Sequence, residues 1–422
     1  MAAETIFTWG APPLKFGDGA LDEIGFDAAG LGMRHLALVS DPGVANAGLV
    51  ERGQRALDAA GVAFETYVGV HAEPTDASIG EAVDWVRSAG VDGFVGIGGG
   101  SVIDTTKAMN LLATNPGELH DFLNPPIGAG RSPEAPLMPM IAVPTTAGTG
   151  SESTPVCVLD VLALRVKTGI SHRSLRPTLA VVDPSTTRTL SPEVAAASGM
   201  DVLCHALESF TARPYSARPS APAGQPRAAY NGANPISDVW SMRALELLGR
   251  WFRRAVHDGD AEARRGMMLA ATYAGIGFGN AGVHIPHACA YPIAGMVRDY
   301  VPAGYEASEP MVPHGQSVVL TAPAAFRFTY SADPERHERV ASLIADDPTR
   351  TAAGPDALPS AIVELSRDLG IPSGLGAVGY VEADIPALVD GAVKQQRLLT
   401  ISPRSVDRDA LAEIFGQSMH NW

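Results

Sequence analysis

The second half of the sequence contains one aspartate and four histidines whose residue types suit a metal site. Asp201 and His205 lie four residues apart in GMDVLCHALESF, a helical pattern that projects both side chains from one face. His284 and His287 follow in GVHIPHACAYPIAG, and His314 lies in VPHGQSVVL. A carboxylate with imidazoles is typical of a borderline divalent ion such as Fe(II) or Zn(II). A histidine on an apolar helix is also common as a packing residue, so both interpretations stay open for each of the four.

A glycine run in the first half is a candidate phosphate site. Gly98, Gly99, Gly100 and Ser101 follow the expected strand GFVGI and open the expected helix SVIDTTKAMNLL. Residues without Cβ let a phosphate approach the backbone, and the free N–H groups of a helix start favour its negative charge. The run is neither the dinucleotide fingerprint GxGxxG, because Ser101 replaces its third glycine, nor a Walker loop, because Ala follows Lys107. Alone it is equally typical of an ordinary turn.

A second polar loop makes a dinucleotide the favoured ligand. PTTAGTGSE, residues 144–152, directly follows the expected strand MIAV. Open parallel sheets bind ligands at the carboxyl ends of their strands, and two such loops would meet there. Asp41, which ends HLALVS, would accept hydrogen bonds from a ribose diol at the same edge. An aspartate before Pro42 and Gly43 is also an ordinary turn residue, so its role stays open.

The elements that must position these residues form two blocks. The first alternates strands with helices, which is typical of a largely parallel sheet; the expected strands are 35–40, 63–68, 93–97, 140–143 and 179–182, and the clearest helical patterns are 47–61 and 76–90. From Ser191 and Pro192 onward a cap followed by proline introduces long helical stretches. We therefore expect an α/β domain over 1–188 and a helical domain over 189–422.

Composition excludes several classes of protein. The 422 residues are 46% hydrophobic and 18% charged, which is typical of folded domains and not of disorder. A net charge of −15 argues against nucleic acid or an anionic membrane as partner. No apolar run is long enough for a membrane span, and the first residues resemble neither a signal nor a transit peptide. Three scattered cysteines fit a reducing compartment, so we expect a cytoplasmic protein.

Six motifs in one order resemble the iron-containing (group III) alcohol dehydrogenase family: GGGSVIDTTK, PTTAGTGSE, RPTLAVVDP, GMDVLCHALES, HACAYPIAG and VPHG. The resemblance covers nearly the whole chain. It implies a Rossmann-like α/β domain with a mostly parallel sheet, followed by an all-α domain, which is the dehydroquinate synthase-like fold of these enzymes. GANPISDVW and VPHGQSVVLTAPAAF are most similar to the hydroxyacid-oxoacid transhydrogenase branch.

The resemblance implies a metal site and leaves the proton relay open. It makes Asp201, His205, His287 and His314 the metal ligands. The implied metal is Fe(II), with Zn(II) as the alternative. The family usually has H-x-x-x-H-P from the third ligand onward, whereas here the second histidine of that pair is Tyr291. Either Tyr291 or His284 is a candidate for the catalytic relay, and packing is an equal alternative for both.

The resemblance also implies an NAD site in the α/β domain. Its members are the glycine-loop residues Gly99, Gly100, Ser101 and Asp104, the second-loop residues Thr145, Thr146, Thr149 and Ser151, and Lys167 in RVKTGI. Lys167 matches a family lysine near the cofactor and is also a catalytic candidate. Asp41 matches the position that receives the adenosine ribose. A carboxylate there would repel a 2′-phosphate, which favours NAD over NADP.

The implied activity is hydride transfer between a small hydroxyacid or alcohol and NAD. In the transhydrogenase branch 4-hydroxybutyrate is oxidised while 2-oxoglutarate is reduced. The alternatives are an NAD(P)-dependent alcohol dehydrogenase or aldehyde reductase that releases its cofactor each turnover, a lyase similar to dehydroquinate synthase, and a non-catalytic metal-binding protein. We expect a homo-oligomer, a dimer, with small-molecule substrates.

The substrates of that branch carry carboxylates, which a planar guanidinium binds well. The segment from Thr211 to Pro235 is rich in proline and cannot form one continuous helix. It contains Arg213, Arg218 and Arg227. One hypothesis is that one of these arginines binds the substrate, and the alternative is that all three are solvated surface charges.

Overall fold

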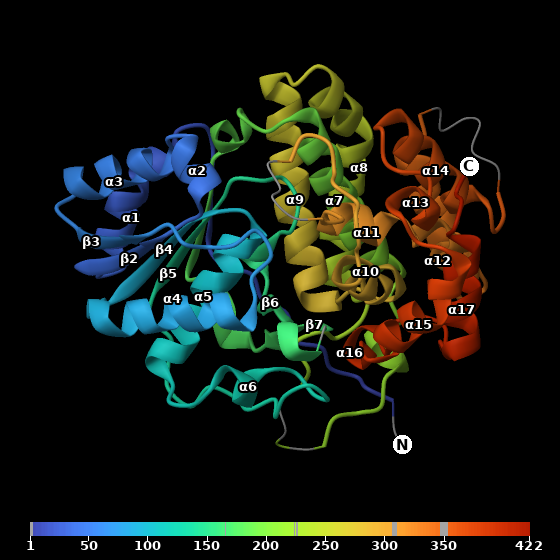
Figure 1. Ribbon diagram of the computed structural model, residues 1–422, viewed down its shortest axis with the longest axis horizontal. Coiled ribbons are helices and arrows are strands. Elements are labelled where there is room, and N and C mark those ends of the chain that lie inside the picture. Colours follow the sequence, from blue (N-terminus) through green and yellow to red (C-terminus); the bar gives the residue numbers. More distant parts are fainter. Residues whose placement is uncertain (1–2, 165, 223, 225–226, 306–309, 347–352) are drawn as a thin grey trace. The chain divides into compact units, whose positions relative to one another are not determined.

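The computed structural model describes residues 3–164, 166–222, 224, 227–305, 310–346 and 353–422. The chain divides into two compact units, one formed by Ala11–Thr189 and the other by Met1–Gly10 with Leu190–Trp422 (Figure 1). This differs from the expected 1–188 domain in one respect, since residues 3–10 pack with the helical unit. They do so because Arg227 forms an ion pair with Glu4, and because Asn280 accepts a hydrogen bond from the Gly10 amide.

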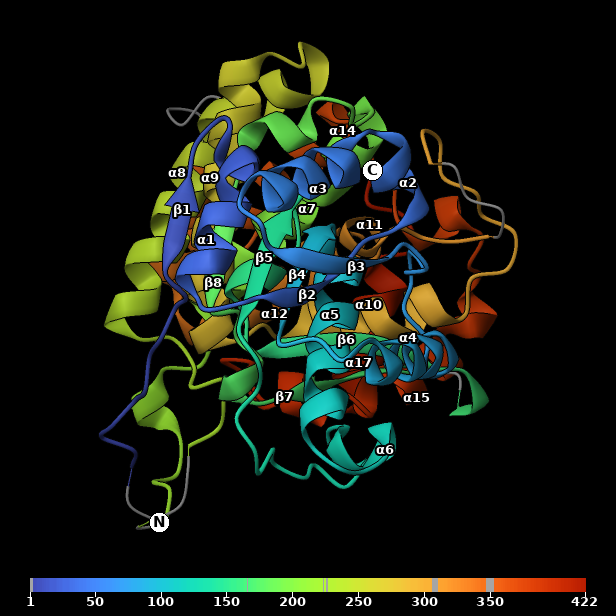
Figure 2. The same ribbon diagram turned by 90° about the vertical axis from the view of Figure 1, so that its left-hand side faces the viewer.

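A six-stranded parallel sheet forms the centre of the first unit, as the sequence analysis predicts (Figure 2). Its strands lie in the order β1-β8-β5-β4-β2-β3. Their bounds are β1 (Leu14–Phe16), β2 (His35–Val39), β3 (Ala63–Tyr67), β4 (Gly93–Gly98), β5 (Met140–Pro144) and β8 (Leu179–Val182). Successive residues of β2 face opposite sides, with Leu36 and Leu38 in one core and Ala37 and Val39 in the other. The sheet is therefore buried on both faces.

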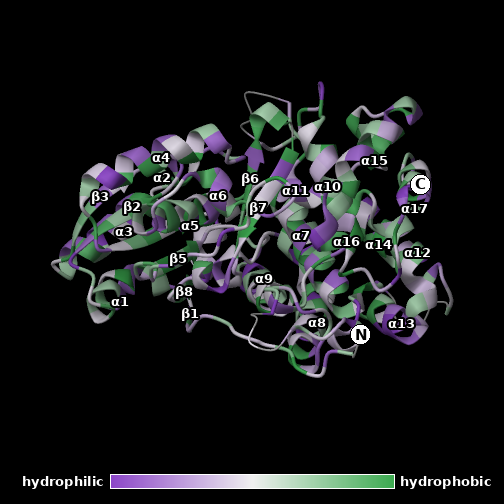
Figure 3. Cartoon of the chain, turned by 90° about the horizontal axis from the view of Figure 1, so that it is seen from below, coloured by the Kyte–Doolittle hydropathy of each residue, from purple (hydrophilic) through white to green (hydrophobic). Residues whose placement is uncertain are grey.

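Helices cover the two faces of this sheet (Figures 1 and 2). On one side lie α1 (Ile24–Gly30) and α3 (Leu49–Ala59), and on the other α4 (Asp76–Ala89) and α5 (Gly100–Thr114), with α2 (Pro42–Asn46) and α6 (Leu119–Phe122) in connections. The covering helices carry both hydrophilic and hydrophobic residues (Figure 3). Helix α4 begins with a capping box between Thr75 and Ser78 and ends at Gly90, whose φ of 65° suits a residue without Cβ.

Three strands of this unit are not among those predicted from the sequence. Strand β1 has only 3 residues, too few to show an alternating pattern. Strands β6 (Val156–Val161) and β7 (Val166–Ser171) form a separate antiparallel hairpin. Its register pairs Asp160 with Lys167, which places the two charges side by side.

Helices form the second unit, as expected. They are α7 (Pro192–Thr211), α8 (Pro235–His257), α9 (Ala261–Ala281), α10 (Ile285–Gly295), α11 (His314–Val319), α12 (Ala322–Thr329), α13 (Pro334–Ile344), α14 (Ala357–Asp368), α15 (Ile385–Val393), α16 (Gln396–Leu399) and α17 (Arg408–Gln417). Helix α7 packs against α8, α9 and α11. Between Thr211 and Pro235 the described residues form one short 3-10 helix, Tyr215–Ala217, and isolated β-bridges such as that of Pro214 with Ala233. Within the described ranges, every helix is too short or too polar to cross a membrane.

Candidate active site

Helix α7 supplies the centre of the histidine and aspartate cluster. It begins at Pro192, where the Ser191 side chain accepts a hydrogen bond from the Val194 amide, as the Ser-Pro start predicts. Asp201 and His205 follow on one face of this helix and are 2% and 4% exposed. Glu208, three residues further along the same face, has no exposed surface. Such a row of buried polar groups requires partners on the neighbouring helices.

Two glycines allow the other histidines to reach α7. Gly282 ends α9 with a φ of 94°, and a Cβ there would lie 2.9 Å from the Tyr230 ring. This tight turn starts α10, which carries His287. At Gly315, a Cβ would lie 1.9 Å from the carbonyl oxygen of Ala197 in α7. Only glycine lets α11 approach α7 closely enough to bring His314 to the cluster.

The three imidazoles converge on one carboxylate oxygen. Oδ1 of Asp201 lies 3.5 Å from Nε2 of His205, 3.4 Å from Nε2 of His287 and 3.8 Å from Nε2 of His314. Ligand atoms of Asp201, His287 and His314 all lie within 4.8 Å of one another. The fourth predicted ligand, His205, reaches the same oxygen while its ring stacks on Phe278 at 3.9 Å. All four predicted ligands therefore meet around one point.

Two buried polar atoms of the cluster make no hydrogen bond and are suited to bind a divalent cation. Oδ1 of Asp201 and Nε2 of His287 are both buried, and neither has a hydrogen-bond partner among the described residues. Unpaired buried polar atoms are costly, and they are the expected state of groups whose partner is a ligand. One carboxylate and three imidazoles match the donors that Fe(II) and Zn(II) accept. These residues therefore fit a bound metal ion.

Glu208 orients one of these imidazoles, a role that the sequence analysis did not foresee. Its Oε2 accepts a hydrogen bond from Nδ1 of His287, and its Oε1 accepts from the backbone N–H groups of His284 (2.8 Å) and His287 (3.2 Å). The Nδ1 bond turns Nε2 of His287 toward Asp201. The spacing of 201, 205 and 208 on one helical face was the available signal.

Protonation follows the surroundings of each ring. Burial lowers the pKa of His205 to about 3, so its imidazole is neutral and free to donate an electron pair. For His287 burial opposes the charge, but the Glu208 and Asp201 carboxylates outweigh it and raise the pKa to about 9. A dication competes with that proton for Nε2, so binding releases a proton. The same three imidazoles hold the pKa of Asp201 below its usual range despite burial.

The two polar loops of the sheet unit lie side by side. The order of the strands reverses between β2 and β4, and open sheets bind ligands at such a switch point. The glycine loop follows β4 there, and the second polar loop follows β5, which pairs with β4. The Thr145 amide donates to the Gly98 carbonyl at 3.0 Å, and a Cβ on Gly100 would meet the Thr149 side chain at 2.6 Å. Thr146 lies next to Gly99 in the same way.

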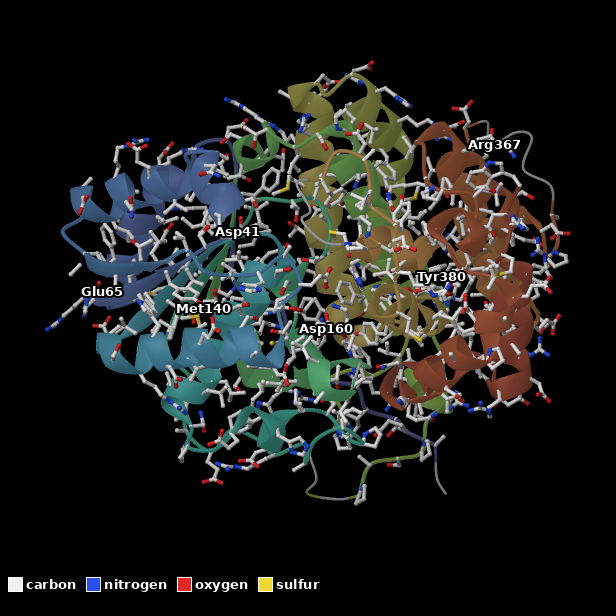
Figure 4. All side chains as sticks on the ribbon, viewed as in Figure 1. Asp41, Glu65, Met140, Asp160, Arg367 and Tyr380 are labelled. Atoms are coloured by element: carbon white, nitrogen blue, oxygen red, sulfur yellow. The ribbon has the colours of Figure 1, made fainter. Side chains whose placement is uncertain are left out.

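Asp41 also lies at this edge, beyond the end of β2 (Figure 4). Its Oδ1 accepts the Val44 amide at 2.9 Å and caps α2. The turn role that the sequence analysis held open is thus present. The second carboxylate oxygen is not used by this cap.

Three of the predicted cofactor residues have internal partners. Asp104 accepts hydrogen bonds from the Ser151 hydroxyl and from the Val158 amide (2.9 Å). Lys107 has no exposed surface, and its ammonium donates hydrogen bonds to the carbonyl and the hydroxyl of the same Ser151, at 2.7 and 2.8 Å. The Ser101 hydroxyl donates to the Ala72 carbonyl. Asp104 and Ser151 therefore hold the second loop against α5.

Lys167 is an ion-paired residue of the β6–β7 hairpin. Its ammonium contacts the carboxylates of Glu73 and, at 2.9 Å, Asp160. Burial opposes its charge, but these carboxylates raise the pKa of Lys167 above its usual value. It remains protonated at neutral pH, which favours an electrostatic role over that of a base.

The chain matches the sequence profile of iron-containing alcohol dehydrogenases over residues 12–184 and that of the C-terminal region of the same family over residues 229–419. It is 44% identical over 421 residues to the mitochondrial hydroxyacid-oxoacid transhydrogenase of Bos taurus, an alignment that covers 98% of this chain and 90% of the relative. The chain belongs to the iron-containing alcohol dehydrogenase family. As a member, it is an oxidoreductase that acts on CH–OH groups, and the family implies a divalent metal.

Solved structures support the same membership. A 1,3-propanediol oxidoreductase superposes with a TM-score of 0.84 at 29% identity, over 98% of this chain and 100% of that one. A sulfoacetaldehyde reductase from Bifidobacterium kashiwanohense, solved in complex with NAD+, has a TM-score of 0.79 at 26% identity and covers 98% of each chain. The α/β plus all-α fold expected from the motifs is confirmed.

The two relay candidates have different surroundings in this family member. His284 has no exposed surface; its Nε2 lies 3.1 Å from the Thr211 hydroxyl, and burial lowers its pKa to about 4. This favours a packing role. Tyr291 is 5% exposed, and its hydroxyl accepts a hydrogen bond from Arg397 at 2.9 Å.

The arginines of the segment after α7 are not equally available. Arg218 donates to the Tyr230 carbonyl, and Arg227 forms an ion pair with Glu4. These two arginines therefore tie the segment to its own unit. The Arg213 side chain has no hydrogen-bond or ion-pair partner among the residues that the structure describes.

Proposed function

We propose that this chain is a hydroxyacid-oxoacid transhydrogenase that oxidises 4-hydroxybutyrate and reduces 2-oxoglutarate. The observation that carries the proposal is the convergence of three imidazole Nε2 atoms on Oδ1 of one buried aspartate, in a chain 44% identical to enzymes of that name. The products are succinic semialdehyde and 2-hydroxyglutarate. The two-electron oxidation of one substrate balances the two-electron reduction of the other, so net turnover consumes no free nucleotide.

Asp201, His205, His287 and His314 would hold the metal, Fe(II) first and Zn(II) as the alternative that accepts the same donors. When bound, such a cation supplies Lewis-acid stabilisation of negative charge on the substrate oxygen. The protein's own contribution is to bury Asp201, His205 and His287 and to orient them around one point. Glu208 does this for His287 through the Nδ1 bond.

Replacing Glu208 by glutamine is expected to weaken metal affinity by about 10- to 100-fold. The amide has one acceptor oxygen for three N–H donors, and its NH2 group faces a donor. Competition with a chelator, followed by metal analysis, measures the change. Glu193→Gln is the matched control, because Glu193 lies exposed on the same helix. Equal affinities of the two variants would remove the orienting role of Glu208.

NAD would occupy the switch point of the sheet unit and supply hydride acceptance and donation. The start of α5 at Gly99, Gly100 and Ser101 offers backbone N–H groups to its phosphates. Thr145, Thr146 and Thr149 line the neighbouring loop. The Asp41 carboxylate disfavours a 2′-phosphate, so NAD is proposed over NADP.

The proposal extends to location and assembly. All three cysteines are free and buried, which supports a reducing compartment, and we propose the cytoplasm. The transhydrogenase relatives are named as mitochondrial proteins. We also propose a homodimer, which light scattering of the purified protein tests.

The alternative is an alcohol dehydrogenase or aldehyde reductase that releases its nucleotide. The structural similarity to an oxidoreductase and a reductase, at 29% and 26% identity, favours it. The deciding experiment loads the protein with Fe(II) and NAD, removes free nucleotide, and adds 4-hydroxybutyrate with 2-oxoglutarate. We expect many turnovers to 2-hydroxyglutarate per protein chain. At most one turnover without free NAD, and sustained NAD reduction when NAD is supplied, would establish the alternative.

A further inference from the structure

We infer that Arg397 binds the carboxylate that both substrates carry. The inference rests on the proposed transhydrogenase function and names the residue behind its substrate class. It replaces the hypothesis that an arginine of the proline-rich segment does so. Arg397 lies in α16, far in sequence from every motif that identified the family.

Two tyrosines hold the guanidinium of Arg397. Its Nη2 donates to the Tyr291 hydroxyl at 2.9 Å, and its Cζ lies 5.8 Å from the centre of the Tyr230 ring. Tyr291 and Tyr230 are only 5% and 9% exposed. The planar group is therefore fixed before any ligand arrives, which reduces the entropy cost of binding.

The charge of Arg397 has no counter-ion among the described residues. Its Nη1 is buried and has no hydrogen-bond partner, and no described carboxylate forms an ion pair with it. The side chain of Arg397 is half-buried, and a partly desolvated cation without an anion is energetically unfavourable. Other arginines of this unit are neutralised internally, for example Arg336 by Asp238 at 2.6 Å. An anionic ligand would satisfy both the charge and the unused Nη1 of Arg397.

The position of Tyr291 relates Arg397 to the metal ligands. Tyr291 follows His287 by four residues on α10, so their Cβ atoms are about 5–6 Å apart on one face of the helix. At this position the family pattern has its second histidine. Tyr291 thus links the guanidinium to the cluster that contains His287.

The chemistry of the two substrates explains why one arginine can serve both. In 4-hydroxybutyrate the carbon that is oxidised lies three carbon–carbon bonds from the carboxylate. In 2-oxoglutarate the carbon that is reduced lies three such bonds from the distal carboxylate. A single cation at a fixed separation from the metal ligands would place either reacting carbon at the same point. The substrate class is therefore acids with this three-bond spacing.

The test compares the wild-type protein, loaded with Fe(II) and NAD, with Arg397→Met, Arg397→Lys and a control, Arg408→Met. Arg408 is exposed and forms an ion pair with Asp390 at the surface. Each protein oxidises 4-hydroxybutyrate and 1-butanol, which has the same carbon chain without a carboxylate. We expect Arg397→Met to raise KM for 4-hydroxybutyrate about 10- to 100-fold. Any loss in kcat/KM for 1-butanol, which has no carboxylate to bind, should be at least about 10-fold smaller than the loss for 4-hydroxybutyrate. Arg397→Lys should fall between, and the control should match wild type.

A second measurement needs no reaction. Glutarate carries a carboxylate at each end but has no hydroxyl or keto group that could react. Its binding is followed by thermal shift. Loss of the glutarate shift in Arg397→Met alone supports the inference. Equal glutarate shifts and equal KM values for wild type and Arg397→Met would overturn it. If wild type oxidises 1-butanol but not 4-hydroxybutyrate, the proposed function fails, while a glutarate shift that depends on Arg397 still supports its role as a carboxylate ligand.

Discussion

Replacing His287 by alanine is expected to empty the metal site and to lower turnover at least about 10³-fold. The Nε2 of this residue lies 3.4 Å from Oδ1 of Asp201. It belongs to the group of Asp201, His287 and His314, whose ligand atoms all lie within 4.8 Å of one another. Lewis-acid stabilisation contributes several kcal/mol to such reactions, and about 4 kcal/mol corresponds to about 10³-fold in rate. Metal content by plasma emission and turnover of 4-hydroxybutyrate with 2-oxoglutarate provide the two measurements.

The control for this variant is His120→Ala, because His120 is exposed and lies in the sheet unit. Its metal content and turnover should equal those of wild type. Thermal unfolding by circular dichroism establishes that His287→Ala is folded. A folded His287→Ala protein with full metal content and normal turnover would exclude His287 from the site.

The second large effect concerns stability. Lys107→Met is expected to destabilise the sheet unit by about 3–5 kcal/mol, because removing one member of a buried charged network leaves the others unsatisfied. Four acceptors would each lose one donor: the carbonyl and hydroxyl of Ser151, the hydroxyl of Thr154 and the carbonyl of Val156. The Asp104 carboxylate would also lose its nearest cation.

Hydrogen exchange at the Val158 amide measures this effect, because that amide donates to Asp104. About 3 kcal/mol corresponds to an exchange rate roughly 10²-fold higher than in wild type. NAD affinity should fall as well, since Ser151 holds the second loop. Lys15→Met is the matched control: Lys15 forms partly exposed ion pairs in the same unit, and their loss should cost less than about 1 kcal/mol. Equal exchange in both variants would refute the structural role of Lys107.

Most of the sheet could be predicted from the sequence because its strands are short apolar runs between turn residues. The five expected strands all form, from β2 at His35 to β8 at Val182. The missed hairpin β6–β7 is different, because it makes no part of the buried sheet and its residues alternate only in part. Residues 3–10 were also unpredictable, since their partners Arg227 and Asn280 are more than 200 positions away.

Some residues of the candidate site could be predicted from the sequence, and others could not. The i, i+4 spacing predicted that Asp201 and His205 share a face, a local property of one helix. The family resemblance, and not the sequence spacing, predicted that His287 and His314 approach Asp201 and His205. Residue spacing along the chain does not encode contacts between distant helices. Glu208 had a local signal that was overlooked. Arg397 had none, since its relation to Tyr291 exists only in the folded chain.

The central claim is that one metal ion joins Asp201, His205, His287 and His314. Diffraction from crystals grown with Fe(II), recorded on both sides of the iron absorption edge, tests it most directly. We expect one strong anomalous peak at about 2.0–2.3 Å from a carboxylate oxygen of Asp201 and from one nitrogen of each histidine. No peak at that point in iron-loaded crystals, or a peak held by other side chains, would contradict it.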